Sequence, residues 1–213
     1  MTPSPYETVL GDDLTRLHLR LRAYFAAIPE GSVGRGEGVF DVVGTPRLWL
    51  WPVLFVLGRL GIAFPAWEHG VPFRVENRPA ATGRPAVDAV RTFSFPRGER
   101  RMVDAIAAEP GGLVDHLGGR RLLVAELAAE VRDRRLLLTG RGLRIRLGGR
   151  SLRVPAAVAP GVALVERFDD ERDRQHVSVT LTLPVIGTIY QYSGYFEYAV
   201  EPFGAAHTEG TPS

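Results

Sequence analysis

Apolar and polar residues alternate along most of the chain from residue 71 onward. This alternation gives a β-strand one apolar and one polar face, and it is clear over 71–76, 89–95, 123–131 and 177–183. Glycine- and proline-rich turns separate these segments, and no helical pattern intervenes. The pattern therefore predicts antiparallel strands that pair with their neighbours in the sequence.

The beginning of the chain has helical spacing instead. Ser4-Pro5-Tyr6-Glu7 forms a capping box with proline at the first helical position. Apolar residues then recur at intervals of three or four, at Leu14, Leu17, Leu21 and Phe25. We expect a short helix followed by an amphipathic helix within residues 5–27.

Residues 48–57 form the most apolar segment of the chain, Leu-Trp-Leu-Trp-Pro-Val-Leu-Phe-Val-Leu. A membrane-spanning helix needs about 20 apolar residues, and Pro52 and Arg59 interrupt this stretch. We therefore expect a helix over 47–62 that is buried or lines a cavity. A helix lying on a membrane surface is the alternative interpretation.

Together these patterns predict an α+β fold with about eight to ten antiparallel strands in a strongly curved sheet or half-barrel. The N-terminal helices and the apolar helix would cover its concave face, and a complete calycin-like barrel is the alternative. We expect one domain over 1–202, with helices at 5–27 and 47–62 and antiparallel strands over 71–200. Residues 203–213 are small and polar, and we expect a disordered tail there.

A glycine pair at 148–149 predicts a two-residue hairpin turn, which places Leu147 opposite Arg150 and Arg144 opposite Arg153. Seven arginines lie between residues 134 and 153, and no acid occurs from 134 through 165. This face could contact phosphate headgroups, since arginine binds phosphate with two hydrogen bonds. We favour the alternative, a solvated outer face balanced by acids of a neighbouring strand.

Composition excludes several kinds of chemistry. The chain has no cysteine, and all 26 of its Lys and Arg residues are arginine, so disulfides, thiolate sites and lysine-based catalysis are excluded. Its net charge is only +2, which does not favour nucleic-acid binding. The five histidines lack metal-ligand spacing. Absence of a secretory signal and of cysteine predicts a cytoplasmic protein, and the arginine-, alanine- and glycine-rich composition indicates a GC-rich bacterial genome.

Two further patterns concern glycines and aromatic residues. The run Gly34-x-Gly36-x-Gly38 leads into a strand rather than a helix, so we interpret it as a flexible connection or bulge and not as a nucleotide loop. In the last predicted strand one face carries Tyr190, Tyr192, Phe196 and Tyr198, with Gly194 between them. This glycine leaves room for a close backbone contact or a ligand.

Glu166 is the most unusual charged residue, because Leu164 and Phe168 flank it on the same strand face. An interior carboxylate must be paired or must take up a proton. We therefore predict that Glu166 is buried and bonded to an arginine, foremost Arg91, or to a tyrosine of the last strand.

Two stretches near the end of the chain, Leu183-Pro184-Val185-Ile186-Gly187 and Tyr192-Ser193-Gly194-Tyr195-Phe196-Glu197, match the pattern L-P-x-x-G … Y-x-G-x-x-E. In this they resemble DUF4166, a bacterial family of unknown function. Further matching stretches are Tyr6–Gly11, Leu60-Gly61, Val71–Val75 and 154–166. The resemblance covers most of residues 5–200.

The resemblance implies no established activity, and it transfers no catalytic residue. It does imply an association, since domains of this family often follow an NAD(P)-binding reductase-type domain or accompany small membrane domains. Relatives often carry a histidine near Phe25 and a glutamate near Asp115, and this chain departs from both patterns.

We expect a non-catalytic binding domain for a small apolar or amphipathic molecule, held in a cavity between the curved sheet and the apolar helix. The candidate ligand-binding residues are Trp49, Trp51, Phe55, Arg91, Asp115, Glu166, Tyr190 and Tyr192. We expect no cofactor, metal or nucleic acid, and no residue is assigned a catalytic role.

Two alternatives belong to other classes of function. One is an accessory or catalytic domain of an NAD(P)-dependent reductase system, with Glu166 or Asp115 as acid or base beside Tyr192. The other is a membrane-peripheral domain in which the 48–57 helix and the arginine hairpin contact lipid.

Overall fold

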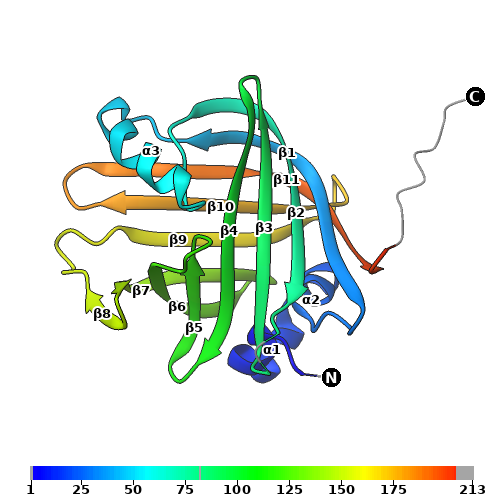
Figure 1. Cartoon of the computed structure of the whole chain (residues 1–213). Helices are drawn as coiled ribbons and strands as arrows, with labels where there is room; N and C mark the ends of the chain where they lie inside the picture. Colours follow the sequence, from blue (N-terminus) through cyan, green and yellow to red (C-terminus); the bar gives the residue numbers. More distant parts are fainter. Residues whose placement is uncertain (1, 82, 205–213) are drawn as a thin grey trace, which may run out of the picture.

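The computed structural model describes residues 2–81 and 83–204, and most of them belong to one antiparallel β-sheet (Figure 1). Its strands in chain order are β1 (Ser32–Gly44), β2 (Trp67–Pro79), β3 (Ala86–Phe95), β4 (Gly98–Glu109), β5 (Gly112–Leu117), β6 (Leu123–Arg132), β7 (Arg135–Leu147), β8 (Arg150–Arg153), β9 (Gly161–Asp169), β10 (Arg174–Leu183) and β11 (Gly187–Pro202). Ten of them follow one another in the order β6-β5-β4-β3-β2-β1-β11-β10-β9-β7, and β7 pairs again with β6. The sheet is therefore a closed barrel, and the short β8 is paired with β7 alone.

The predicted α+β fold with an open curved sheet or half-barrel is wrong, because the sheet dominates the chain and closes on itself. Closure needs pairs that are distant in sequence: β7 meets β9 through Leu136–Thr139, and β1 meets β11 along Ser32–Gly44. The closed barrel, which the sequence left as the alternative, is the architecture found. All the strand pairings of the described residues are antiparallel, as predicted.

The described residues form three short α-helices and two 3-10 helices. They are α1 (Pro5–Leu10), η1 (Gly11–Arg16), α2 (Leu19–Phe25), η2 (Leu48–Leu50) and α3 (Trp51–Arg59). The predicted capping box is confirmed at α1: the Glu7 N–H donates to the Ser4 hydroxyl at 3.0 Å, and the Ser4 N–H donates to the Glu7 carboxylate at 2.6 Å. None of these helices is both long and apolar enough to cross a membrane.

Successive connections of an antiparallel barrel alternate between its two ends. We call the end that α1, η1 and α2 cover the closed end, and the opposite end the mouth end. At the closed end lie α1, η1 and α2 with the β2–β3, β4–β5, β6–β7 and β9–β10 connections (Figure 1). The N–H of His18 donates to the carbonyl of Arg134 at 3.0 Å, and its Nε2 lies 3.0 Å from Asp170. Leu21 and Phe25 pack on the interior residues of β5, β6 and β7.

The mouth end carries η2 and α3, which connect β1 to β2, and the β3–β4, β5–β6, β7–β9 and β10–β11 connections (Figure 1). The prediction that this apolar helix covers a concave sheet face is wrong, because a closed barrel has no open concave face. Leu54 is buried, whereas Trp49, Trp51 and Phe55 are 59%, 40% and 54% exposed. The helix therefore turns one apolar face into the barrel and leaves the other outside.

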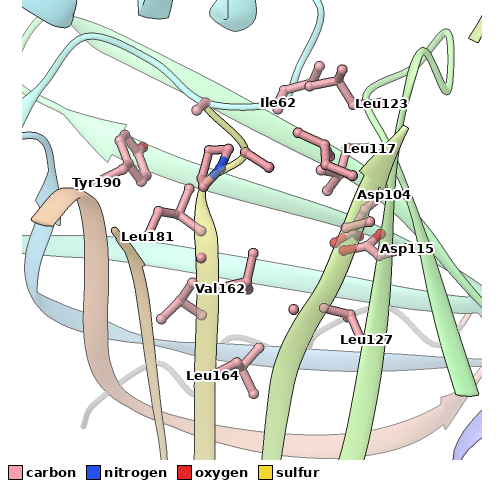
Figure 2. A pocket seen from close by; sticks show the side chains of 18 of the residues that line it. Ile62, Asp104, Asp115, Leu117, Leu123, Leu127, Val162, Leu164, Leu181 and Tyr190 are labelled. Atoms are coloured by element: carbon pink, nitrogen blue, oxygen red, sulfur yellow. The ribbon is translucent and has the colours of Figure 1, made fainter. Parts of the chain in front are cut away.

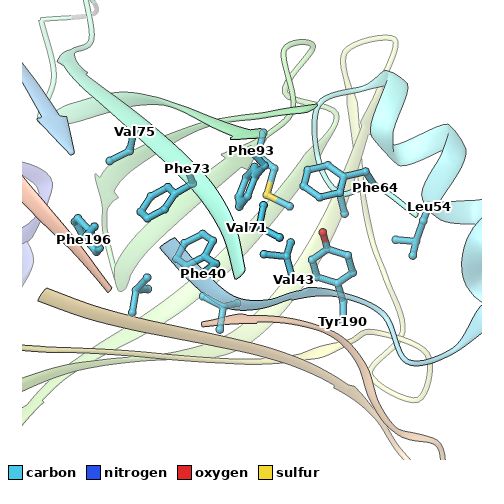
Figure 3. Close-up of a cluster of buried hydrophobic side chains, with 14 residues drawn as sticks. Phe40, Val43, Leu54, Phe64, Val71, Phe73, Val75, Phe93, Tyr190 and Phe196 are labelled. Carbon is cyan, nitrogen blue, oxygen red and sulfur yellow. The ribbon is translucent and has the colours of Figure 1, made fainter. Parts of the chain in front are cut away.

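An aromatic cluster fills the barrel beside β1, β2 and β3 (Figure 3). The rings of Phe40 and Phe73 stack with centroids 4.0 Å apart, and Phe93 lies 5.5 Å from Phe40. The interpretation of Gly34, Gly36 and Gly38 as a flexible connection or bulge is wrong, since all three lie inside paired β1 and its register shift comes later, between Phe40 and Val42. A Cβ at Gly38 would overlap the backbone of β11. The strand needs glycine for close approach, and the same holds for Gly194 against Phe40.

The predicted hairpin register of β7 and β8 is confirmed, with Arg144 opposite Arg153. Glu126 of β6 balances the two like charges: its carboxylate lies 3.1 Å from the Arg144 Nε and 3.6 Å from the Arg153 Nη2. The favoured explanation, acids from a neighbouring strand, is therefore correct for this pair. The sequence predicts a disordered tail over 203–213. The N–H of Phe203 donates to the carbonyl of Gly31 at 2.6 Å, and residues 205–213 lie outside the described residues.

Candidate functional site

The barrel encloses a cavity of about 860 Å³ between the inner face of α3 and the N-terminal helices. Its walls are mainly aliphatic (Figure 2), contributed by Leu117, Leu123, Leu127, Val162, Leu164 and Leu181. Several lining residues at the mouth end, among them Val53, Arg153 and Ala156, are also solvent-exposed. The cavity therefore reaches the surface between α3 and the β8–β9 connection.

Charged side chains meet on one wall of this cavity. Arg91 of β3 pairs with Met102 of β4, which puts Asp104 diagonally next to Arg91 on the same inward face. The Arg91 guanidinium donates to the Asp104 carboxylate, and both side chains are largely buried. Burial alone would lower the pKa of Arg91, but the charge and hydrogen bond of Asp104, together with Tyr192 and Tyr24, raise that pKa above its ordinary value. Arg91 therefore keeps its charge.

Asp115 of β5 lies beside Asp104 (Figure 2), because its cross-strand partner Ile106 is two residues from Asp104. Burial raises the pKa of Asp115 well above its ordinary value, and the negative charge of Asp104 raises it further. The Arg91 charge opposes both effects without cancelling them, so Asp115 holds its proton more tightly than an exposed aspartate. Within residues 2–81 and 83–204, no group donates a hydrogen bond to the buried Oδ1 of Asp104 or of Asp115.

Glu166 is buried in β9, as predicted, with 7% of its surface exposed. The predicted arginine or tyrosine partner is wrong: the Gln175 amide donates to the Glu166 carboxylate. Gln175 comes from β10, where Val177 is the cross-strand neighbour of Glu166, so the two side chains are diagonal neighbours. Burial raises the pKa of Glu166 to about 7, against the opposing effects of Gln175 and the Arg91 charge.

Tyr190 and three further tyrosines line the cavity, and the three further ones belong to its polar part. Tyr6 of α1 and Tyr24 of α2 close it from the N-terminal side, and Tyr192 of β11 adds a third ring. Burial raises the pKa of all three phenols, that of Tyr192 to about 12, so they stay neutral and can donate hydrogen bonds. The cavity thus offers donors and acceptors deep inside and aliphatic walls toward its mouth.

The structure brings five of the eight predicted site residues into this cavity: Arg91, Asp115, Glu166, Tyr190 and Tyr192. Trp49, Trp51 and Phe55 lie outside it, and their neighbours Leu50, Val53, Leu54 and Leu57 line it instead. The expectation that the apolar helix is buried or lines a cavity therefore holds for its inner residues and is wrong for these three aromatic side chains. Helical geometry gives the reason, since the residues facing the cavity recur every three or four positions and the three aromatic residues fall between them.

Sequence reasoning missed Asp104, Gln175, Tyr6 and Tyr24. The sequence could have identified Asp104, because it stands between the apolar residues Met102 and Ile106 at every second position of its strand, which places all three on the inward face. The sequence could not identify the two helix tyrosines, since only tertiary packing brings α1 and α2 to the barrel. In the described part of the chain, no three His, Asp or Glu side chains are grouped so that they could hold a metal ion.

Comparison with known proteins gives a family and no activity. The chain is 25% identical over 152 residues to YndH of Bacillus subtilis (strain 168), a protein described as uncharacterized, and the match covers 67% of this chain and 74% of that protein. No solved structure matches the chain significantly. A match over residues 17–196 shows that the chain belongs to the family described as domain of unknown function DUF4166.

Proposed function

We propose that the barrel binds one small amphipathic molecule without chemically changing it. The observation that carries the proposal is the cavity of about 860 Å³, with aliphatic walls and a few polar groups at its depth. Ligand sites in proteins usually measure about 300–1,000 Å³ and combine apolar walls with a small number of polar groups that orient the ligand. The apolar part of the ligand would point to the mouth, and its polar part would reach Arg91, Asp104 and Asp115.

The charges around the cavity favour an uncharged polar group on the ligand. Among the residues that the structure describes, Arg91 is the one largely buried cation of the cavity wall, since Arg141 and Arg153 are exposed, and Asp104 already neutralises Arg91. Burial raises the pKa of Asp115, which disfavours its charged form, and a pKa of about 7 leaves Glu166 partly ionised at neutral pH. An anionic ligand group would therefore meet carboxylates without a free cation. A hydroxyl or carbonyl group suits the site, because it can exchange hydrogen bonds with Asp104 Oδ1, Asp115 and the tyrosines.

Native mass spectrometry of the purified protein tests this proposal, because an amphipathic ligand that fits the cavity should travel with the protein. We expect an additional mass of a few hundred daltons at one per chain, which organic solvent releases. The variant Leu181→Trp obstructs the cavity with a bulky ring from β10, and Val39→Trp adds the same ring to the exposed outer face of β1. The mass should disappear in Leu181→Trp and persist in Val39→Trp, and a ligand-sized mass that stays in both variants would contradict the proposal.

A further inference from the structure

The connections at the two ends of the barrel differ in charge. At the mouth end they span 45–66, 96–97, 118–122, 148–160 and 184–186, and they contain seven arginines and no Asp or Glu. At the closed end, residues 2–31 and the connections 80–85, 110–111, 133–134 and 170–173 contain six arginines and eight acids. A net charge of +2 for the whole chain therefore hides a strongly basic mouth end.

Exposed apolar side chains gather at the same end. Sixteen large apolar side chains are exposed in the described residues, and eleven of them belong to the mouth-end connections or the β7–β8 hairpin. Six come from the segment that forms η2 and α3: Leu48, Trp49, Trp51, Val53, Phe55 and Val56. Single exposed apolar residues are normal on a protein surface, but a concentration around one opening indicates an interaction surface.

Hydrogen bonds join three of these five connections, and we call the surface formed by all five and by Leu147 the mouth surface. Arg47 donates to the carbonyl of Ile186 at 2.9 Å, which ties the start of η2 to the β10–β11 turn (Figure 1). The N–H of Gly119 donates to the carbonyl of Leu60 at 3.1 Å, which ties the β5–β6 turn to the end of α3. The guanidinium of Arg59 lies 4.7 Å from the centre of the Phe55 ring. Cationic and aromatic groups thus share the mouth surface.

We propose that the mouth surface docks on a lipid bilayer that contains anionic lipids. Tryptophan and phenylalanine partition into the boundary between headgroups and acyl chains, and arginine binds lipid phosphate. Arg120 and Arg150 are exposed, and no carboxylate of the described residues lies within 4.0 Å of either guanidinium. Their charge is therefore available to an anionic partner.

A bilayer explains the mouth surface better than a protein partner does. The apolar residues come from a short helix and from tips of turns, which project separately rather than forming a sheet edge or a groove that a second chain could fill. The connections of the mouth end carry arginines and no acid, although strand carboxylates pair with Arg121 and Arg153. This excess of one sign fits a surface of uniform negative charge, whereas protein interfaces pair both signs. A cavity that opens within the mouth surface would receive its ligand from the bilayer, and that consequence alone rests on the proposed function.

Flotation with vesicles tests the apolar part of the proposal. The protein should float with vesicles of equal parts phosphatidylcholine and phosphatidylglycerol. The double variant Trp49→Ser/Phe55→Ser should bind about tenfold more weakly or worse, because it removes two interfacial aromatic groups. Leu19→Ser/Phe203→Ser is the matched control, since both residues are exposed and lie toward the closed end. The control should float like the unmodified protein.

A second pair of variants tests the charge. Arg120→Gln/Arg150→Gln should weaken binding to the anionic vesicles about fivefold for each arginine removed, and added salt should reduce the difference. Arg134→Gln/Arg135→Gln makes the same charge change at the closed end and should leave binding unchanged.

Several outcomes would overturn the proposal. One is an unmodified protein that floats with neither the anionic vesicles nor vesicles of phosphatidylcholine alone. Another is weaker binding in the closed-end controls than in the mouth variants. Self-association that Trp49→Ser/Phe55→Ser abolishes, without vesicle binding, would show that a second copy of the chain covers the mouth surface. Leu181→Trp separates this proposal from the cavity ligand, because it should float normally while losing the ligand.

Discussion

Apolar helices lie at both ends of the barrel, but those at the closed end bury their apolar side chains whereas the one at the mouth end leaves many of them exposed. At the closed end, α1 and α2 bury their apolar faces on β5–β7, and hydrogen bonds and ion pairs join them to the strand connections. At the mouth end, α3 buries Leu54 and leaves Trp49 and Phe55 in solvent. The comparison shows that an apolar helix on a barrel stabilises the fold only through its inner face, so the outer face is available for another role.

The largest expected effect comes from removing equivalent phenyl rings at the two ends. Phe25→Ala leaves a cavity beneath α2, where Phe25 is 1% exposed, and should lower the free energy of unfolding by about 3–5 kcal/mol. Phe55→Ala should change it by at most about 0.5 kcal/mol, because that ring is half exposed. Urea denaturation of both variants measures the difference, and similar losses at the two ends would contradict the comparison.

The buried Glu166 between the two ends gives a pH-dependent test. Its folded pKa of about 7 lies above the ordinary value of 4.5, so the folded state holds the proton more tightly. The resulting stability is fully present below pH 4.5 and is lost as the pH rises through 7, by about 3 kcal/mol in total. Glu166→Gln mimics the protonated acid and lacks this loss.

Unfolding of Glu166→Gln and of the unmodified protein at pH 5 and pH 8 measures the effect. The variant should gain stability relative to the unmodified protein at the higher pH. Asp115 contributes the same pH dependence to the free energy of unfolding of both proteins, so its contribution cancels when the two are compared. Glu37→Gln, on the exposed outer face of β1, is the control and should leave the pH profile unchanged. Parallel profiles for Glu166→Gln and the unmodified protein would show that Glu166 is not shielded from water.

The capping box of α1 tests how firmly the closed end is attached. Ser4→Ala removes the acceptor of the Glu7 N–H and the hydroxyl that donates to the Phe25 carbonyl at 2.6 Å. We expect a loss of about 1–2 kcal/mol. Ser151→Ala, on exposed β8 near the mouth, should be neutral. Thermal melts compare the two, and an unchanged melting temperature in Ser4→Ala would mean that α1 contributes little to the closed end.

The smallest effect is expected at the arginine hairpin of the mouth end. Glu126→Gln removes the carboxylate between Arg144 and Arg153. These side chains are partly exposed, so the loss of stability should stay below about 1 kcal/mol. High salt should abolish the difference, because it screens the repulsion between the two arginines. A loss that high salt does not change would point to packing rather than charge.

Local patterns predicted the local structure. The register of β7 and β8 follows from the glycine turn and from alternation, and the capping box follows from four consecutive residues. Barrel closure could not be predicted in the same way, because β1–β11 and β7–β9 join segments that no local pattern links. The orientation of α3 was also hidden, since its apolar residues extend around the whole helix.

The residues of the candidate site also fall into two groups, those that local patterns predict and those that depend on long-range packing. Strand parity identified Glu166 as an interior acid, and it could have identified Asp104. It could not identify Gln175 as the partner, because that choice depends on how β9 and β10 align. Tyr6 and Tyr24 reach the cavity only because the N-terminal helices close one end of the barrel.

Titration with an uncharged fluorescent probe, N-phenylnaphthylamine, tests most directly the claim that the cavity binds an apolar ligand. The unmodified protein, Val39→Trp and Trp49→Ser/Phe55→Ser should each saturate at one probe per chain, and folded Leu181→Trp should show no saturable binding. Saturable binding that persists in Leu181→Trp but disappears in Trp49→Ser/Phe55→Ser would place the probe on the mouth surface and contradict the claim.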